Sequence, residues 1–259
     1  MRRRPTLALA AALALLAPCA ARACSLELIL ALDVSGSIDG AEFTLQTDGL
    51  AAALEHARLA AAVEALPGGM LLTVTHWSGV SRQSQMIPWR KVNTAAELDA
   101  AAHEIRTAGR AWRNFSTAIG EALQHARAVS EAAPEDCDRK VVDVSGDGVS
   151  NEGRAPGAVS AQLAAEGYTI NGLVIRGAQP DPLEQYMHEV IAGPGAFVEV
   201  AESFEDYPRA ILRKLLREID APLLVSRHDS APHHSNAMAA APVRAQPTGT
   251  TPGVSSTSR

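Results

Sequence analysis

Residues 26–37, with the sequence LELILALDVSGS, decide the fold of this chain. The first part, Leu26 to Leu32, is apolar except for one acid and predicts a β-strand that is buried on both faces. The polar residues Asp33, Ser35 and Ser37 follow at alternate positions, which point three oxygen-bearing side chains to one side of an extended or looping backbone. A buried strand that ends in such a loop is typical of the edge of a parallel sheet where ligands bind.

Strands and helices alternate outward from this stretch. Expected strands are Leu26–Leu32, Met70–Trp77, Gln85–Pro88, Lys140–Val144, Tyr168–Ile175 and Ala196–Val200. Expected helices are Asp39–Ala65, Thr94–Arg106, Thr117–Ala128, Ala158–Glu166, Pro182–Ile191 and Phe204–Ile219. This order predicts a doubly wound α/β fold with a mostly parallel central sheet between two helical layers. Pro88 excludes a central position for its strand, so we expect one antiparallel edge strand there.

The N-terminal residues 1–23 have the layout of a secretory signal peptide. Three arginines precede a short apolar run, Leu7 to Ala17, and the segment ends in Ala21-Arg22-Ala23. A membrane anchor is the alternative, but the run has only about half of the roughly 20 residues that span a bilayer. Lipidation at Cys19 is a further alternative, although Pro18 occupies a position that favours a small residue. We therefore expect a periplasmic or secreted protein without a membrane span.

The C-terminal residues 221–259 have the composition of a disordered tail. This segment has no aromatic residue, a single acid in Asp229, and prolines scattered among Ser, Thr, Ala and Gly. Such a composition buries too little apolar surface to offset the entropy of ordering the chain. Its histidines could form a metal tract, but a polar tail that happens to contain histidines is the simpler interpretation.

The remaining residues 24–220 predict one acidic globular domain. The whole chain has a formal net charge of −6, whereas the 16 basic and 28 acidic residues of this domain give −12. An acidic domain argues against a nucleic-acid partner, which requires a basic surface to neutralise phosphates. The sequence contains no nucleophile elbow, phosphate-binding loop or zinc-protease motif, so no common enzyme class is indicated.

A second polar loop follows the predicted strand Lys140–Val144. Its sequence, Ser145-Gly146-Asp147-Gly148, places a carboxylate between two glycines. An isolated Asp-Gly is usually only a turn former. If the two strands are neighbours, however, Asp33 and Asp147 face each other where the strand order reverses. Carboxylates and hydroxyls without nearby Cys or His favour Mg²⁺, Mn²⁺ or Ca²⁺ over Zn²⁺.

These motifs resemble the metal-ion-dependent adhesion site (MIDAS) of von Willebrand factor A (vWA) domains. The family pattern is Asp-x-Ser-x-Ser, a distant Thr and a distant Asp-Gly, which Asp33-x-Ser35-x-Ser37, Thr117 and Asp147-Gly148 match. The stretch after Thr117 is similar to the family's Thr-x-Thr-Gly-x-Ala-Leu, with Ile119 in place of the second Thr. Residues 141–148 together with 193–197 further resemble an uncharacterised secreted bacterial branch of the family.

The resemblance implies a binding module rather than an enzyme. Its ligand set would hold a divalent ion, either directly or through water, and consists of Asp33, Ser35, Ser37, Thr117 and Asp147. The ion would recognise a Glu or Asp carboxylate on a protein partner. Two alternatives stay open: a metal-dependent hydrolase that activates water, and a structural domain whose site is unoccupied.

Two cysteines support the same strand order. Cys24 lies nine residues before Asp33, and Cys137 lies ten residues before Asp147. Parallel neighbouring strands lie about 4.8 Å apart, so nearly equal offsets place both cysteines side by side within disulfide range. An oxidising compartment would let this bond form. Two unpaired thiols, or a lipid on Cys24, are the alternatives.

Overall fold

The computed structural model describes residues 24–228, with side chains described as far as Asp220. The predicted signal peptide, residues 1–23, and residues 229–259 of the predicted tail lie outside the described residues. The last helix, α7 (Tyr207–His228), continues beyond the expected domain end at Asp220. Within residues 24–228, no helix combines the length and hydropathy of a membrane span.

The centre of the fold is a six-stranded sheet with the strand order β3-β2-β1-β4-β5-β6. Neighbouring strands are parallel except at β3, which pairs with β2 in antiparallel orientation at one edge. This arrangement confirms the predicted doubly wound α/β fold and its single antiparallel edge strand. The strands are β1 (Cys24–Asp33), β2 (Met70–Trp77), β3 (Gln83–Val92), β4 (Cys137–Gly146), β5 (Tyr168–Ile175) and β6 (Val198–Ala201).

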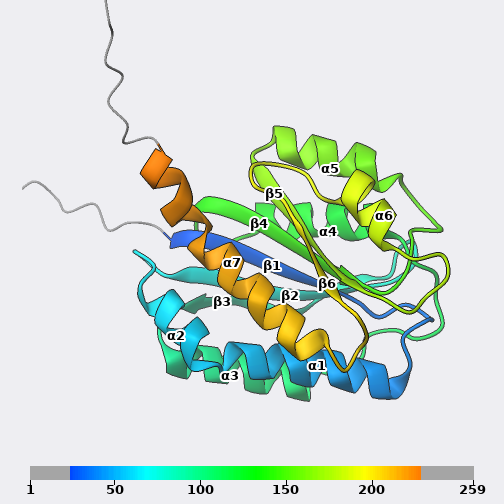
Figure 1. The fold of residues 1–259 in the computed structure, drawn as a ribbon, viewed down its shortest axis with the longest axis horizontal. Helices are drawn as coiled ribbons and strands as arrows, with labels where there is room; N and C mark the ends of the chain where they lie inside the picture. Colours follow the sequence, from blue (N-terminus) through cyan, green and yellow to red (C-terminus); the bar gives the residue numbers. More distant parts are fainter. Residues whose placement is uncertain (1–23, 229–259) are drawn as a thin grey trace, which may run out of the picture.

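Helices cover both faces of the sheet (Figure 1). One face carries α7 and the helices α1 (Gly40–Leu54), α2 (Ala57–Glu64) and α3 (Ala95–Thr107). The other carries α4 (Ile119–Glu131), α5 (Pro156–Ala165), α6 (Leu183–Gln185) and the π-helical turn Tyr186–Val190.

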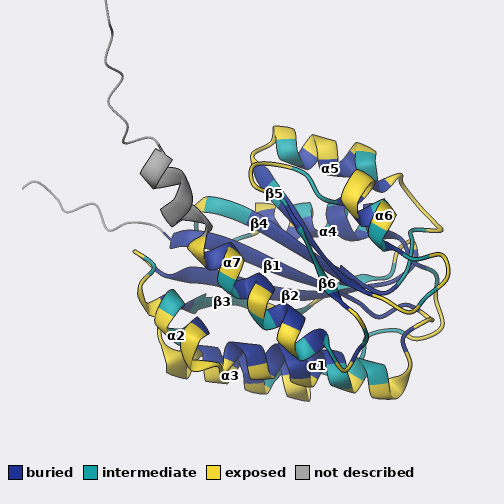
Figure 2. Cartoon of the chain, viewed as in Figure 1, coloured by how far each residue is buried: buried dark blue, intermediate teal, exposed yellow. Residues whose placement is uncertain are grey.

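Alternating side chains of β1 supply both hydrophobic cores. Leu28 and Leu30 point into the core beneath α1 and α7, while Ile29 and Ala31 point into the core beneath α4 and α5. Every residue of β1 is buried, as Figure 2 shows for the central strands. The continuous apolar run in the sequence therefore corresponds to a strand with no solvent-facing side.

The structure corrects two predicted elements. The expected helix Asp39–Ala65 is two helices, because the chain bends at Glu55 and His56 begins α2 by accepting a hydrogen bond from the Arg58 amide at 3.2 Å. The edge strand is longer than Gln85–Pro88. Pro88 lies where the β2–β3 register shifts, so its missing N–H breaks only one point of the ladder.

Two further boundaries differ from the expected ones. The segment Pro182–Ile191 is a short α-helix followed by a π-helical turn rather than one regular helix. Helix α7 begins at Tyr207 instead of Phe204, after a turn in which the Asp206 and Tyr207 amides bond back to Ser203 and Phe204. Neither difference changes the strand order that positions the site.

Cys24 and Cys137 lie opposite each other in the β1–β4 register, as the nearly equal sequence offsets predicted. Their Cα atoms are 4.5 Å apart, and the sulfurs are bonded across a sequence separation of 113 residues. The bond joins the starts of the two strands whose ends carry Asp33 and Asp147.

We expect the double variant Cys24→Ser with Cys137→Ser to lower the free energy of unfolding by about 2–5 kcal/mol, because a long loop of the unfolded chain is no longer closed. Urea unfolding followed by circular dichroism measures this loss. Reductant should lower the stability of the wild type and leave the double variant unchanged. Equal stability of both proteins in oxidising buffer would contradict the prediction.

Candidate metal centre

The loop that follows β1 folds around the carboxylate of Asp33. This side chain is fully buried, and its Oδ1 accepts a hydrogen bond from the Ser35 amide at 2.7 Å. The Ser35 and Ser37 hydroxyl oxygens lie 3.3 Å apart, so they point to the same side of the loop. Gln46 of α1 donates to the Asp33 backbone oxygen at 3.1 Å and fastens the loop to the helix.

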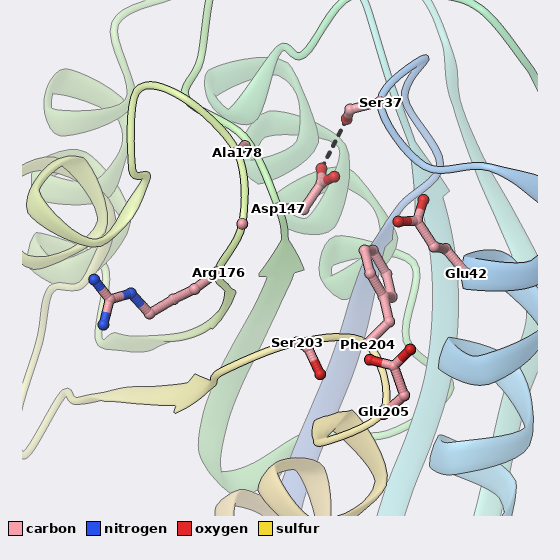
Figure 3. A pocket seen from close by; sticks show the side chains of 9 residues that line it. Ser37, Glu42, Asp147, Arg176, Ala178, Ser203, Phe204 and Glu205 are labelled. Atoms are coloured by element: carbon pink, nitrogen blue, oxygen red, sulfur yellow. Dashed lines mark hydrogen bonds between the residues drawn. The ribbon is translucent and has the colours of Figure 1, made fainter.

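Asp147 joins this loop because β1 and β4 are neighbours. The Ser37 hydroxyl donates to Asp147 Oδ1 at 2.8 Å, a contact drawn in Figure 3. The strands β2 and β3 lie on one side of β1, and β5 and β6 lie on the far side of β4. The contact therefore lies at the point where the strand order reverses. Ligands of open α/β sheets bind at this point.

Thr117 reaches the same edge from the loop before α4. Its backbone is held by Asn151 through two hydrogen bonds: the Thr117 amide donates to Asn151 Oδ1 at 3.0 Å, and the Asn151 amide donates to the Thr117 carbonyl at 2.9 Å. A Cβ placed on Gly148 would lie 3.6 Å from Thr117 Oγ1, so the hydroxyl lies beside the Asp147 loop. The fold thus brings all five predicted ligand residues to one edge of the sheet.

The two carboxylates are held without a neutralising cation. Burial, and next the charge of Asp147, raise the pKa of Asp33 to about 8, and burial also raises the pKa of Asp147. Arg110 opposes both shifts, but its guanidinium donates to the backbone oxygens of Val34 and Ser35 at 3.0 and 2.8 Å. Asp33 Oδ2 is buried and has no hydrogen-bond partner. The lone pairs of Asp33 Oδ2 are therefore available to a positively charged ligand.

The donor chemistry of this edge fits a hard divalent ion. Two carboxylates and three hydroxyls are oxygen ligands of the kind that Mg²⁺, Mn²⁺ and Ca²⁺ prefer. In the part of the chain that the structure describes, no group of three or more His, Cys, Asp or Glu side chains could hold a metal ion. An ion at this edge would therefore depend on the hydroxyls of Ser35, Ser37 and Thr117.

Four side chains that support the site were missed by the sequence analysis. Asn151 could have been found, because it follows the Asp147-Gly148 pair closely in a polar loop. Gln46 and Arg110 lie in segments with no motif and act on backbone oxygens, which leaves no pattern in the sequence. Tyr186 lies under the site: a Cβ on Gly146 would come within 2.7 Å of its hydroxyl and 3.0 Å of Asp33 Oδ2.

A histidine near the end of β2 is part of the core. His76 is the second-last residue of β2, is buried, and packs edge-on against the Phe43 ring at 5.7 Å between centroids. Burial, followed by the charge of Arg110, lowers its pKa to about 4, so its imidazole is neutral at physiological pH. This packing gives His76 a structural role.

A cleft of about 370 Å³ opens beside Asp147 (Figure 3). Glu42, Phe204 and Glu205 line one wall, and Ser37 and Asp147 form the border with the candidate metal centre. Arg176 points away from Asp147 and pairs with Asp181 at 2.7 Å. The cleft therefore lies between the candidate metal centre and the loop that joins β6 to α7.

The sheet order and the helical layers give the chain the fold of vWA-type domains. Proximal thread matrix protein 1 from the mussel byssus is 20% identical over 75% of this chain and 47% of its own, with a TM-score of 0.58. A structure of the same mussel protein with a zinc-occupied MIDAS motif is 19% identical over 76% of this chain and 46% of its own, with a TM-score of 0.57. The von Willebrand factor type A protein from Catenulispora acidiphila is 17% identical over 76% of this chain and 43% of its own, with a TM-score of 0.50.

Residues 23–223 match the family DUF1194, described as protein of unknown function, and the chain belongs to this family. The structural matches all have identities that establish the fold alone. A pilus adhesin, SpaC from Lactobacillus rhamnosus GG, shares the fold at 14% identity over 75% of this chain and 30% of its own, with a TM-score of 0.53. The chain spans about half the length of the first structures it matches, and no curated protein matches its sequence.

A pair of glycine substitutions tests the packing under the site. A methyl group on Gly146 would clash with Tyr186 Oη and press on Asp33 Oδ2, whereas one on Gly148 would only touch Thr117 at 3.6 Å or more. We expect Gly146→Ala to lower the free energy of unfolding by about 1–3 kcal/mol, as overpacking does. Gly148→Ala serves as the matched control and should cost clearly less. Chemical denaturation without metal ions measures both, and equal losses would disprove this account.

Proposed function

We propose that this domain is an exported binding module that uses a divalent ion to recognise a carboxylate on a protein partner. The ion would be Mg²⁺, with Mn²⁺ or Ca²⁺ as close substitutes, held by Asp33, Ser35, Ser37, Thr117 and Asp147. The layout of residues 1–23 supports export to the periplasm or the medium. The likeness to a pilus adhesin and to a mussel thread protein with a metal-occupied MIDAS agrees with a role outside the cell.

The observation that carries the proposal is the buried carboxylate pair. Asp33 and Asp147 lie together at the switch point, yet the nearby guanidinium of Arg110 is used on backbone oxygens. Desolvated carboxylates disfavour the charged form strongly unless a positive charge lies beside them. A divalent ion supplies that charge, and it inverts the local preference so that both carboxylates ionise.

The ligand set divides into two kinds of side chain. The neutral hydroxyl oxygens are those of Ser35, Ser37 and Thr117. Asp147 Oδ1 accepts a hydrogen bond from the Ser37 hydroxyl, with 2.8 Å between the two oxygens. When bound, the ion would offer an open coordination position to an outside carboxylate, and it would stay electrophilic because few of its direct ligands would be charged. The domain's own charge of −12 repels acidic partners at long range, so recognition depends on the local field of the site.

A binding role is preferred over hydrolysis because the side chains that could act as a base beside Asp147, namely Asp33, His76 and Glu152, are engaged in other contacts. Asp33 and Asp147 are both committed to the predicted ligand set, and His76 is a buried neutral side chain that packs on Phe43. Glu152, at the rim, is hydrogen-bonded to Ser116 and to the Val80 amide. Metal-dependent turnover of phosphate or ester substrates by the purified protein would contradict this preference.

Asp33→Asn should remove the stabilisation by Mg²⁺ while leaving the metal-free protein at least as stable as the wild type. The amide keeps the shape of the side chain, and a buried neutral group is less costly than a buried carboxylate beside Asp147. For the wild type, a concentration of 100 times the dissociation constant gives about 2.7 kcal/mol of stabilisation. Thermal unfolding with and without Mg²⁺ measures the difference.

The matched control is Asp99→Asn, which removes an exposed carboxylate of α3 far along the chain from the ligand set. It should retain the full response to Mg²⁺. The same titration with Mn²⁺, Ca²⁺ and Zn²⁺ ranks the ions. An undiminished Mg²⁺ response in Asp33→Asn would refute the proposed site.

The partner should require both the metal and a carboxylate. We expect immobilised wild-type domain to retain peptides that contain Asp or Glu in preference to otherwise identical peptides with Asn or Gln. Chelator should release them, and Asp33→Asn should not retain them. Retention that survives both chelation and the substitution would show that binding uses a different surface.

A further inference from the structure

A second group of charged side chains is buried on the opposite side of β4 from α4. Lys214 of α7 places its Nζ 2.7 Å from Asp143 Oδ2 and 2.6 Å from Glu218 Oε1. Lys214 is 0% exposed, Asp143 1% and Glu218 2%. Asn171 of β5 donates to Glu218 Oε1 at 2.8 Å, which fixes the orientation of that carboxylate. An amine and two carboxylates are therefore held together without access to solvent.

The Lys214 ammonium contacts both carboxylates. It donates to Glu218 Oε1 at 2.6 Å and forms an ion pair with Asp143 Oδ2 at 2.7 Å, while Asp143 Oδ1 has no hydrogen-bond partner. Burial is the main reason that the pKa of Asp143 is raised, so its carboxyl tends toward the protonated form. The Phe197 ring lies 5.4 Å from Nζ and adds apolar surface to the surroundings. These conditions resemble those that activate buried lysines as nucleophiles.

We propose that Lys214 and Asp143 form an intramolecular isopeptide bond, with Glu218 as the group that transfers the protons. This is a modification site, independent of the metal centre, that would join α7 to β4 covalently. The amine, the carboxyl carbon and a carboxylate proton carrier are the three groups that such an amide bond needs. All three are positioned by secondary structure rather than by loops.

The step balances without an oxidant or a co-reactant. Proton exchange within the group first makes the amine and the Asp143 carboxyl neutral, and Glu218 accepts a proton from the attacking amine. The Lys214 nitrogen bonds to Asp143 Cγ, the bond from Cγ to one Oδ breaks, and Glu218 returns the proton to that leaving oxygen. One water molecule departs. Because the fold holds the amine beside the carboxyl group, the reaction is effectively unimolecular and needs no encounter between separate molecules.

The bond would also relieve an electrostatic cost. A buried ion pair repays its desolvation only when its remaining oxygens and protons are hydrogen-bonded, and Asp143 Oδ1 lacks such a partner. Conversion of Lys214 and Asp143 to an amide removes two buried charges. Glu218 then keeps the Asn171 amide as a donor at its Oε1.

Peptide mapping of the purified full chain tests the proposal. After reduction, denaturation and digestion with trypsin, we expect residues 141–154 to be joined to residues 214–217, with a mass one water below the sum of the two peptides. Cleavage after Lys214 should be absent, because an amidated lysine is no substrate for trypsin. Glu218→Gln should yield the two peptides separately, while circular dichroism shows that the variant is folded.

An exposed ion pair in the same protein is the internal control. Lys91 Nζ lies 2.6 Å from Glu135 Oε1, as close as the buried pair, but both side chains are 35% exposed. These residues should stay in separate peptides. Full cleavage after Lys214 in the wild type, or a linear 141–154 peptide that has lost water within itself, overturns the isopeptide bond. A joined peptide in Glu218→Gln overturns the role of Glu218.

Discussion

The parallel pairing of β1 with β4 is the constraint on which the rest of the structure depends. In one register it places Cys24 beside Cys137 at the start of the strands and brings the loops of Asp33 and Asp147 together at their ends. In sequence order, β2 and β3 come between these two strands, and both lie on the other side of β1 in the sheet. The reversal of strand order is therefore also the origin of the open edge where the hydroxyls and carboxylates meet.

The domain has two groups of buried carboxylates, and their surroundings differ. At the sheet edge, Asp33 lies beside Asp147 with an unpartnered oxygen, which suits an ion from solution. Inside the domain, Asp143 of the same strand faces Lys214, a cation from the chain itself. Asp143 within β4 and Asp147 in the loop that follows β4 therefore lie in different surroundings. The sites are close in sequence but open to different environments, because alternate and terminal positions of a strand face different neighbours.

Much of the fold was predictable because β1, β4 and β5 are buried on both faces, which leaves continuous apolar runs in the sequence. Asp33, Ser35, Ser37 and Asp147 could be expected to meet because they form motifs at the ends of β1 and β4. Thr117 comes from the loop before α4 and was included only through the vWA resemblance. The bend at His56 was not, since no proline or glycine marks it. Arg110 was also missed because tertiary packing alone brings its guanidinium to the Val34 and Ser35 carbonyls. Whether the predicted ligands bind a metal stays a prediction.

The described chain begins and ends on the same side of the molecule. Figure 1 shows the start of β1 beside the far end of α7, while β1 and β4 carry their polar loops to the other side. Any attachment through either end, whether to a surface, a resin or a neighbouring domain, therefore leaves the cleft and the carboxylate pair facing outward. A tether of this kind restricts the orientation of the domain without covering the candidate metal centre. Two attachment points on one side also permit insertion into a longer chain with little distortion of either partner.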